Sequence, residues 1–203
     1  MDGTSRASST ALAVAKRRLR RAIRSRAARA ASATSAGAAG EAVALRLLRA
    51  PSLWRRERWI LYAALPDELP LWPLFERLRA RGRAVLLPRL RGSRLEFAQV
   101  RELGDLSRGS HGILEPRAAL PALALRPADV VLVPGRAFDR AGHRLGRGGG
   151  SYDRAFAAAC APPLRIGVGY AWQIIERVPR DSRDRRVDAI VTERALCWAG
   201  GRR

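Results

Sequence analysis

The sequence predicts a single three-layer α/β domain over residues 14–203, in which helices flank a mostly parallel, open sheet. Apolar runs of strand length alternate along the chain with segments of helical periodicity, which is the pattern of strand–helix–strand units. Residues 129–134 (DVVLVP) form a continuous β-branched run, typical of a parallel strand buried on both faces. A chain of 203 residues, 47% of them hydrophobic, is long enough to enclose one core, and it shows no internal repeat.

The individual elements follow in an order that supports this fold. Residues 1–13 carry little pattern and predict a flexible tail, although the absence of acidic residues between Asp2 and Glu41 also fits an organellar transit peptide. Helices are expected over residues 14–30, 41–50, 70–81 and 152–160, with a Ser/Ala/Gly linker over 31–40. Strands are expected over residues 59–65, 84–88, 95–100, 129–134, 164–170 and 187–192. Ligands of such sheets bind beyond the carboxyl ends of the strands, so residues 63–68, the loop after Pro134 and the segment after Tyr170 should share one rim.

The composition excludes several classes of protein. Cys160 and Cys197 are too few for a disulfide framework or a Cys-rich zinc site, and His111 and His143 lie too far apart for an HxxxH metal motif. We interpret both histidines as surface residues and both cysteines as reduced residues of a cytoplasmic protein. No run approaches the ~20 apolar residues of a membrane span, so we expect no membrane partner. We expect a monomer.

The charge of the chain predicts anionic partners. The formal net charge is +21, and Lys16 is the only lysine among the 39 basic residues. Because no lysine follows a glycine run, the chain has no Walker A motif. The arginines are scattered at helical spacing, which favours compositional bias plus an anionic small substrate over nucleic acid. A basic nucleic-acid-binding protein remains an alternative, and steep loss of affinity with salt would support it.

Residues 133–153 (VPGRAFDRAGHRLGRGGGSYD) are the stretch most informative about chemistry. Four glycines crowd into residues 146–150, where they allow positive φ angles and a close approach of backbone N–H groups to an anion. Arg144 and Arg147 lie among them and can donate two parallel hydrogen bonds to a phosphate or a carboxylate. The segment leads into a predicted helix, whose N-terminus also favours negative charge. We interpret it as a polyphosphate site; the alternative is an ordinary flexible surface loop.

Carboxylates beside bound phosphates are the usual protein ligands of Mg²⁺. Asp153 follows the glycine loop directly, and it could equally stabilise the helix N-terminus. Asp184 and Asp188 precede the last predicted strand, and either could supply a second ligand or be a solvated acid.

The loop resembles the signature of the 5-formyltetrahydrofolate cyclo-ligases, also called methenyltetrahydrofolate synthetases. Their pattern is roughly Pro-Gly, Phe-Asp and then Gly-x-Arg-Leu-Gly-x-Gly-x-Gly-Tyr-Tyr-Asp. Residues 16–20 (KRRLR), Asp67-Glu68, 112–116 (GILEP) and 170–192 agree with other segments of that family in order and spacing. The resemblance covers residues 15–193.

This resemblance implies an enzyme that converts 5-formyltetrahydrofolate to 5,10-methenyltetrahydrofolate and releases ADP and phosphate from ATP. It implies ATP and a reduced folate as substrates, and Mg²⁺ as cofactor. It implies catalytic roles for Lys16 and Arg147, and magnesium binding by Asp153 and Asp184. The implied ATP-binding residues are Lys16, Arg17, Arg18, Leu19, Arg20, Arg144, Leu145, Gly146, Arg147, Gly148, Gly149, Gly150, Ser151 and Tyr152. The implied folate-binding residues are Ala63, Glu68, Arg147, Gly148, Gly149, Gly150 and Ser151, with Glu68 at the pterin.

The chain departs from the family pattern mainly on the folate side. Ser151 replaces the first of the two tyrosines, and Leu71 replaces a usual threonine. The entry to the last strand carries Arg183 before Asp184 and lacks the usual acid and His. An ATP-binding paralogue with altered or lost folate activity is therefore a second alternative. ATP turnover driven by 5-formyltetrahydrofolate would separate these readings.

Overall fold

A seven-stranded sheet forms the centre of the computed structural model, which describes residues 3–30, 35–109 and 112–201. The strand order is β12-β11-β9-β6-β1-β2-β3. The strands are β1 (Arg58–Ile60), β2 (Ala84–Arg91), β3 (Arg94–Gln99), β6 (Val130–Pro134), β9 (Leu164–Val168), β11 (Ala189–Val191) and β12 (Leu196–Trp198). The inner strands pair in parallel, and β3 and β12 add antiparallel edges. The predicted α/β class with a mostly parallel open sheet is confirmed.

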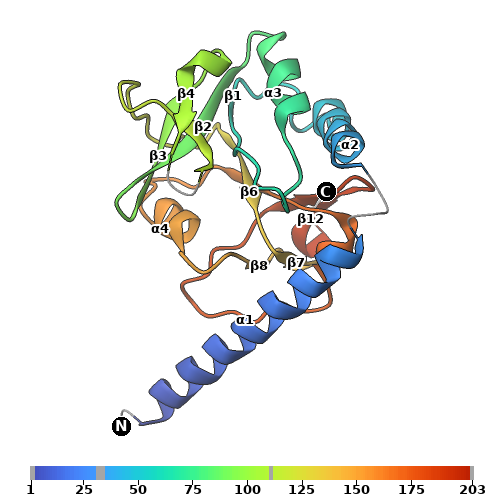
Figure 1. The fold of residues 1–203 in the computed structure, drawn as a ribbon, viewed down its shortest axis with the longest axis vertical. Coiled ribbons are helices and arrows are strands. Elements are labelled where there is room, and N and C mark those ends of the chain that lie inside the picture. Colours follow the sequence, from blue (N-terminus) through green and yellow to red (C-terminus); the bar gives the residue numbers. More distant parts are fainter. Residues whose placement is uncertain (1–2, 31–34, 110–111, 202–203) are drawn as a thin grey trace.

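Helices cover both faces of this sheet (Figure 1). The α-helices are α1 (Gly3–Ala30), α2 (Ala36–Arg49), α3 (Trp72–Arg79) and α4 (Ser151–Ala157). Alternate residues of β6 show the two cores: Val130 and Leu132 pack with α2 and α3, whereas Val131 and Val133 pack with Phe156 of α4. Side chains of a strand alternate between faces, so the continuous apolar run serves both cores at once.

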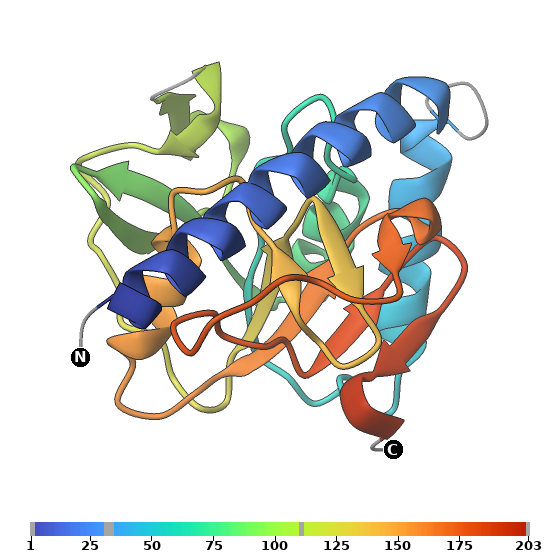
Figure 2. The ribbon, with the colours of Figure 1, turned by 90° about the horizontal axis from the view of Figure 1, so that it is seen from below.

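A small second sheet supports α1. Its order is β10-β7-β8, with β7 (Ala137–Asp139), β8 (Arg144–Leu145) and β10 (Ile174–Ile175). Figure 2 shows α1 crossing over this sheet. Ile23 of α1 is buried there with Ala137, Leu145 and Val178. The remaining elements are a hairpin of β4 (Leu106–Arg108) and β5 (Leu114–Pro116) and the short 3-10 helices η1 (Leu103–Asp105), η3 (Ala171–Gln173) and η4 (Ala199–Gly201).

The N-terminal segment differs from the sequence prediction. Helix α1 begins at Gly3, so most of the segment predicted as a tail over residues 1–13 is helical. The segment holds no proline and continues directly into the helix predicted over residues 14–30, so nothing in the sequence stops the helix from beginning earlier. Helix α2 begins within the predicted linker, because the Ser35 side chain caps it by accepting a hydrogen bond from the N–H of Ala38 at 3.2 Å.

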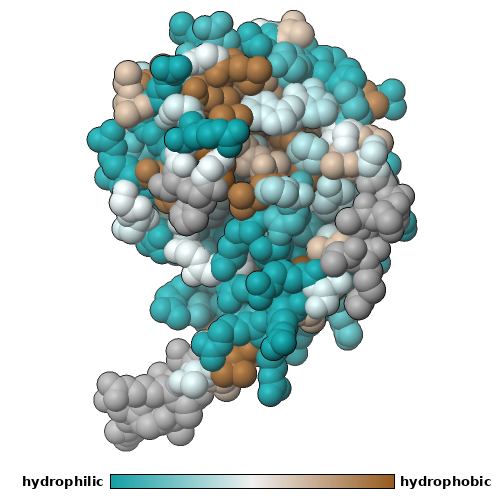
Figure 3. All heavy atoms as spheres, in the orientation of Figure 1, coloured by the Kyte–Doolittle hydropathy of each residue, from teal (hydrophilic) through white to brown (hydrophobic). Residues whose placement is uncertain are grey.

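The surface of α1 is strongly basic. Arg17, Arg18, Arg21, Arg24 and Arg26 are exposed, and the visible part of the helix is mostly hydrophilic in Figure 3. Within the described ranges, no helix is both long and apolar enough to span a membrane. Cys160 and Cys197 are free and exposed, in agreement with two unpaired thiols.

Candidate functional site

The glycine loop lies where β8 ends and α4 begins, directly against α1. The Nε of Arg20 donates a hydrogen bond to the carbonyl of Gly146 at 2.9 Å. Gly148 has a φ of 118°, and a Cβ added there would lie 3.7 Å from the guanidinium carbon of Arg20. That backbone angle favours glycine strongly, so the sequence supplies glycine where the loop must turn beside the helix. Residues separated by more than one hundred positions are thereby joined.

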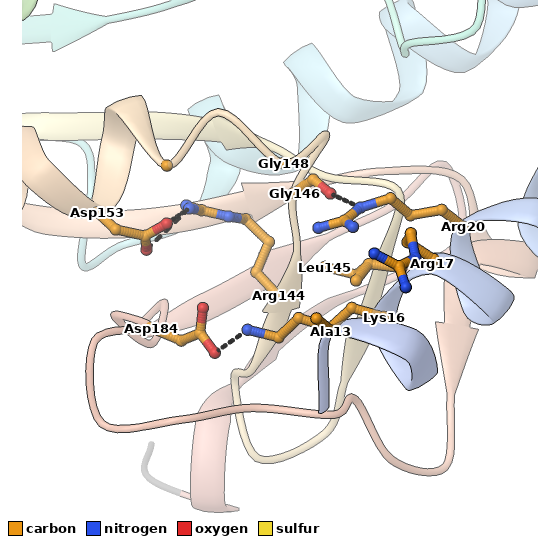
Figure 4. A pocket seen from close by; sticks show the side chains of 11 residues that line it. Ala13, Lys16, Arg17, Arg20, Arg144, Leu145, Gly146, Gly148, Asp153 and Asp184 are labelled. Atoms are coloured by element: carbon orange, nitrogen blue, oxygen red, sulfur yellow. Dashed lines mark hydrogen bonds and ion pairs between the residues drawn. The ribbon is translucent and has the colours of Figure 1, made fainter. Parts of the chain in front are cut away.

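A pocket of about 360 Å³ opens between α1, the glycine loop and the segment that holds Asp184 (Figure 4). Its lining residues are Ala13, Lys16, Arg17, Arg20, Arg144, Leu145, Gly146, Gly148, Gly150, Asp153 and Asp184. Four of these side chains are cationic and two are anionic, which leaves an excess of positive charge. Such a pocket attracts an anionic ligand.

Ion pairs hold the charged side chains of this pocket in place. The Nζ of Lys16 donates to Oδ2 of Asp184 at 2.6 Å, and one amino group of Arg144 donates to both oxygens of Asp153 at 3.0 Å. The backbone N–H of Arg185 also donates to Asp153, at 3.1 Å. The carboxylate of Asp184 therefore joins its own segment to α1, and that of Asp153 joins α4 to β8 and to the segment of Arg185. Lys16 and Arg144 each have an anionic partner.

Arg144 retains a donor without a partner. Its side chain is only 5% exposed, and its second amino group is buried and donates to no acceptor among the described residues. Leaving a buried donor without an acceptor costs about 1–3 kcal/mol, and more when the group is charged. An anionic ligand in the pocket would supply the missing acceptor.

Burial also affects Arg20 beside this pocket. Burial lowers the pKa of its guanidinium, the charge of Asp184 opposes that effect, and the nearby charge of Arg136 adds to it. Burial is the largest of these effects, so phosphate oxygens beside Arg20 would favour its charged form.

Arg147 points away from the pocket and towards a pair of acids after β1. Its Nε donates to Oε1 of Glu68 at 2.9 Å, and one amino group donates to Oδ1 of Asp67. Arg136, which follows β6, donates to the other oxygen of Asp67. Burial alone would raise the pKa of Asp67, but the hydrogen bond and charge of Arg147 and the charge of Arg136 hold it below its ordinary value.

Tyr152 lies near this acidic pair. Its hydroxyl is buried and has no partner among the described residues. Burial, together with the charge of Glu68, raises the pKa of the phenol, so the hydroxyl stays protonated. Its ring lies 5.7 Å from the guanidinium carbon of Arg144, which links this region to the pocket.

A family model described as the 5-formyltetrahydrofolate cyclo-ligase family matches residues 13–193. The chain belongs to this family. A 5-formyltetrahydrofolate cyclo-ligase of Mycolicibacterium smegmatis is 35% identical over 126 residues, which are 59% of this chain and 64% of that protein. The match therefore spans less than two thirds of that relative. A protein of the same name from Escherichia coli (strain K12) is 30% identical over 157 residues, covering 75% of this chain and 86% of its own length.

A solved structure agrees with this membership in the cyclo-ligase family. The NMR structure of Aquifex aeolicus 5,10-methenyltetrahydrofolate synthetase superimposes with a TM-score of 0.77 at 30% identity. The superposition covers 93% of this chain and 94% of that one. The resemblance seen in the glycine loop therefore extends to the whole fold.

Not all of the residues that the cyclo-ligase resemblance implies line the pocket. Lys16, Arg17, Arg20, Arg144, Leu145, Gly146, Gly148, Gly150, Asp153 and Asp184 do so. Arg18 is exposed, and Leu19 packs beside the buried Ile23. Arg147 and Glu68 pair with each other instead. Gly149 and Ser151 are held by Arg154, whose guanidinium donates to the Gly149 carbonyl at 2.7 Å and to the Ser151 hydroxyl at 3.4 Å. Ala63 follows β1 on the predicted rim.

The structure distinguishes the two candidate second metal ligands of this family member. Asp184 lines the pocket, whereas Asp188 is occupied by Arg165, whose backbone N–H and guanidinium both donate to it at 2.8 Å. Among residues 3–30, 35–109 and 112–201, no three His, Cys, Asp or Glu side chains gather into a metal centre. Asp153 and Asp184 are the two acidic side chains among the residues that line the pocket.

His143 corrects an expectation. It was predicted as a surface residue, but it is buried, and its Nδ1 lies 3.0 Å from both carboxylate oxygens of Asp139. Arg180 contacts its Nε2. Asp139 of β7 and the distant Arg180 lie on either side of the imidazole ring. Local sequence cannot show this enclosure. His111, the other predicted surface histidine, lies outside the described residues.

Sequence reasoning assigned no role to Arg136 and Gln173, which connect the rim. The side-chain amide of Gln173 donates to the carbonyls of Gly135 and Arg136 at 3.0 and 3.1 Å, and its oxygen accepts from the N–H of Tyr170 at 2.7 Å. These contacts join the carboxyl ends of β6 and β9, and Arg136 extends the connection to Asp67. The shared rim that the sequence predicted is therefore confirmed. Arg136 and Gln173 follow the buried strands β6 and β9, and this position was the signal by which the sequence could have indicated them.

Proposed function

We propose that this protein converts 5-formyltetrahydrofolate to 5,10-methenyltetrahydrofolate with hydrolysis of ATP to ADP and phosphate. The observation that supports this most is the pocket between α1 and the glycine loop, where buried Arg144 keeps a donor without a protein partner. A triphosphate supplies acceptors of matching charge. The names of the family and of the relatives supply the substrate class.

The proposed reaction begins when the formyl oxygen attacks the γ-phosphorus of ATP. An O–P bond forms while the bond between that phosphorus and ADP breaks. The N10 amine of the folate then adds to the formyl carbon, phosphate leaves with the former formyl oxygen, and the N10 proton is released. Both steps depend on positioning and charge neutralisation more than on a covalent nucleophile.

The residues of this chain fit those requirements. Lys16 and Arg20 reach into the pocket from α1, and Arg144 reaches it from β8, so three cations approach the phosphates from two sides. Glu68 is only 11% exposed and accepts the Leu65 N–H on Oε2 at 3.1 Å, which fixes its carboxylate. We infer that this carboxylate orients the pterin through hydrogen bonds.

The two pocket carboxylates also fit Mg²⁺. Mg²⁺ commonly takes one or two carboxylates plus phosphate oxygens, and Asp153 and Asp184 offer that set beside the proposed phosphates. When bound, the ion would neutralise charge on the phosphate oxygens. Lys16 and Arg144 neutralise these carboxylates in the structure and would be freed for the nucleotide.

One departure from the family pattern has a structural explanation. Leu71, where a threonine is usual, is 2% exposed and packs in the core between α2 and α3. Its side chain serves packing here. Ser151 is different, because it begins α4 beside the glycine loop, and it is where a changed folate preference would arise.

The test is the growth of methenyltetrahydrofolate absorbance when protein, Mg²⁺, ATP and 5-formyltetrahydrofolate are mixed. Formation of product in proportion to ADP supports the proposal. ATP binding with no product would indicate a paralogue that has lost folate chemistry. Salt-sensitive binding of DNA or RNA without ATP turnover would indicate a nucleic-acid-binding protein. The monomeric state and the cytoplasmic location stay predictions.

A further inference from the structure

Arg147 occupies a position that its proposed role does not explain. It lies in the glycine loop between Gly146 and Gly148, yet its guanidinium does not line the phosphate pocket. It spans to the rim after β1 instead, where Nε donates to Glu68 at 2.9 Å and an amino group donates to Asp67. Burial alone would lower the pKa of Arg147, but the charges of Glu68 and Asp67 raise it. The acidic pair therefore holds this cation on the folate side of the site.

Asp67 connects two arginines at this point. One oxygen accepts from Arg147 and the other accepts from Arg136. Arg136 is itself fixed, since its N–H donates to the Leu145 carbonyl at 2.7 Å and its own carbonyl accepts from Gln173 at 3.1 Å. The main chain of Arg136 is therefore hydrogen-bonded on both sides, and its guanidinium holds the carboxylate of Asp67. Arg147 is flanked by glycines on both sides, which allow its backbone more conformations than that of Arg136.

We propose that Asp67 is a positioning residue, which together with Glu68 holds Arg147 away from the phosphates until folate binds. The proposal rests on the function proposed above. When the N–H donors of the pterin take the Oε1 of Glu68, Arg147 loses its hydrogen-bond acceptor there and turns to the phosphates of ATP. Folate binding thereby completes the cationic site, and ATP without folate meets an incomplete one.

Three features of the structure support this exchange. A single oxygen of Glu68 holds Arg147, while the other accepts the Leu65 N–H, so pterin and Arg147 compete for one atom. The pairing side chains of Arg147 and Asp67 are 37% and 35% exposed, so their ion pair is weak enough to exchange. Gly148 adjoins Arg20, so the backbone of the loop already lies beside the phosphate pocket.

The exchange makes the two substrates bind cooperatively. If folate frees Arg147 for ATP, then ATP must strengthen folate binding by the same factor. Weakening the contact between Asp67 and Arg147 should raise ATP affinity in the absence of folate and reduce the further gain that folate brings. A contact this exposed predicts a change of about fivefold or less.

The experiment measures the dissociation constant of an ATP analogue with a non-hydrolysable β–γ bridge, with Mg²⁺, with and without 5-formyltetrahydrofolate. The variants are Asp67→Asn, Asp67→Glu, Arg147→Ala, and Asp67→Asn combined with Arg147→Ala. The matched control is Glu41→Gln, which removes the acid of another exposed ion pair, Glu41 Oε2 with Arg77 at 2.7 Å, between α2 and α3. Thermal melting checks that each variant is folded.

We expect folate to tighten analogue binding to the wild-type chain. Asp67→Asn should bind the analogue more tightly without folate, by up to about fivefold, with the folate effect reduced by the same factor. Asp67→Glu should restore the wild-type pattern, and Glu41→Gln should retain it. In the Arg147→Ala background the effect of Asp67→Asn should disappear, which excludes a direct effect of Arg136 on the pocket.

The inference is overturned if folate leaves analogue affinity unchanged in the wild-type chain. It is also overturned if Asp67→Asn keeps the full folate effect, or if its effect persists without Arg147. These outcomes are distinct from failure of the proposed function, which is read from product absorbance of the wild-type chain. A chain that forms product but shows no Asp67 dependence refutes only the positioning role.

Discussion

Replacing Lys16, the only lysine of the chain, should weaken ATP binding more than replacing any arginine on the exposed side of α1. Its Nζ lies 2.6 Å from Oδ2 of Asp184 and 4.0 Å from Asp181, and the side chain is only 16% exposed. Lys16→Ala removes one of the four cations that line the pocket and leaves the charge of Asp184 facing the phosphates. A charge-assisted hydrogen bond in such a place contributes about 1.5–3 kcal/mol, so ATP affinity should fall about 10- to 100-fold.

Isothermal titration with the non-hydrolysable ATP analogue measures this change directly. Arg21→Ala is the matched control, because it removes the same charge from the same helix at an exposed residue outside the pocket lining. Lys16→Arg should recover part of the affinity, since it keeps the charge but not the compact ammonium. Equal affinities of the Lys16→Ala and Arg21→Ala variants would refute the placement of the triphosphate at α1.

Three further predictions concern the loop and the core. Gly148→Ala should weaken ATP binding and cost about 1–2 kcal/mol of folding stability, because its φ of 118° strains an L-residue, although the added Cβ would only make ordinary van der Waals contact with Arg20. Gly37→Ala, in the exposed start of α2 with open space around it, should be neutral or stabilising, as urea unfolding would show. Asp129→Ala should lower the free energy of unfolding by about 3 kcal/mol, since its carboxylate is 1% exposed and accepts two hydrogen bonds from Arg58 at 2.7 Å; a loss below about 1 kcal/mol would contradict that account. Burial would raise the pKa of Asp139, but hydrogen bonds from Val178 and His143 hold it below its ordinary value, so its contribution is present at neutral pH and is lost as the pH falls through the folded pKa. Asp139→Asn should therefore be less stable at pH 7 and lose stability less steeply on acidification, which thermal melts from pH 7 to pH 3 would measure.

The site was partly predictable because its central segment is local. The spacing of Gly146, Gly148 and Gly150 predicts a loop with positive φ angles, and Gly148 and Gly150 do have positive φ. The adjoining Arg144 and Asp153 were recognisable as phosphate and metal candidates for the same reason, and both line the pocket. The direction in which Arg147 points was not predictable, because its acidic partners lie some eighty residues earlier in the chain.

Other features of the fold were predicted wrongly or missed because a few neighbouring residues do not carry enough information about them. The start of α1 was missed because residues 1–13 are mostly Ser, Ala and Thr and lack the apolar periodicity by which a helix is recognised. His143 was placed on the surface because a lone histidine is ambiguous in sequence, and its partner Arg180 lies 37 positions away. The short strands of the second sheet hold two or three residues each and are too brief to show a period.

The sequence by itself determined the parallel sheet, the family and the chemical character of the glycine loop, because apolar runs and glycine spacing act over a few neighbouring residues. The tertiary structure alone decided which side chains meet: it brought Lys16 to Asp184, buried Arg144 with one donor unpaired, and turned Arg147 onto Asp67. Charges on a chain with this many arginines can pair in many ways. Only the packing of α1 and the loops at the sheet's rim selects among those pairings.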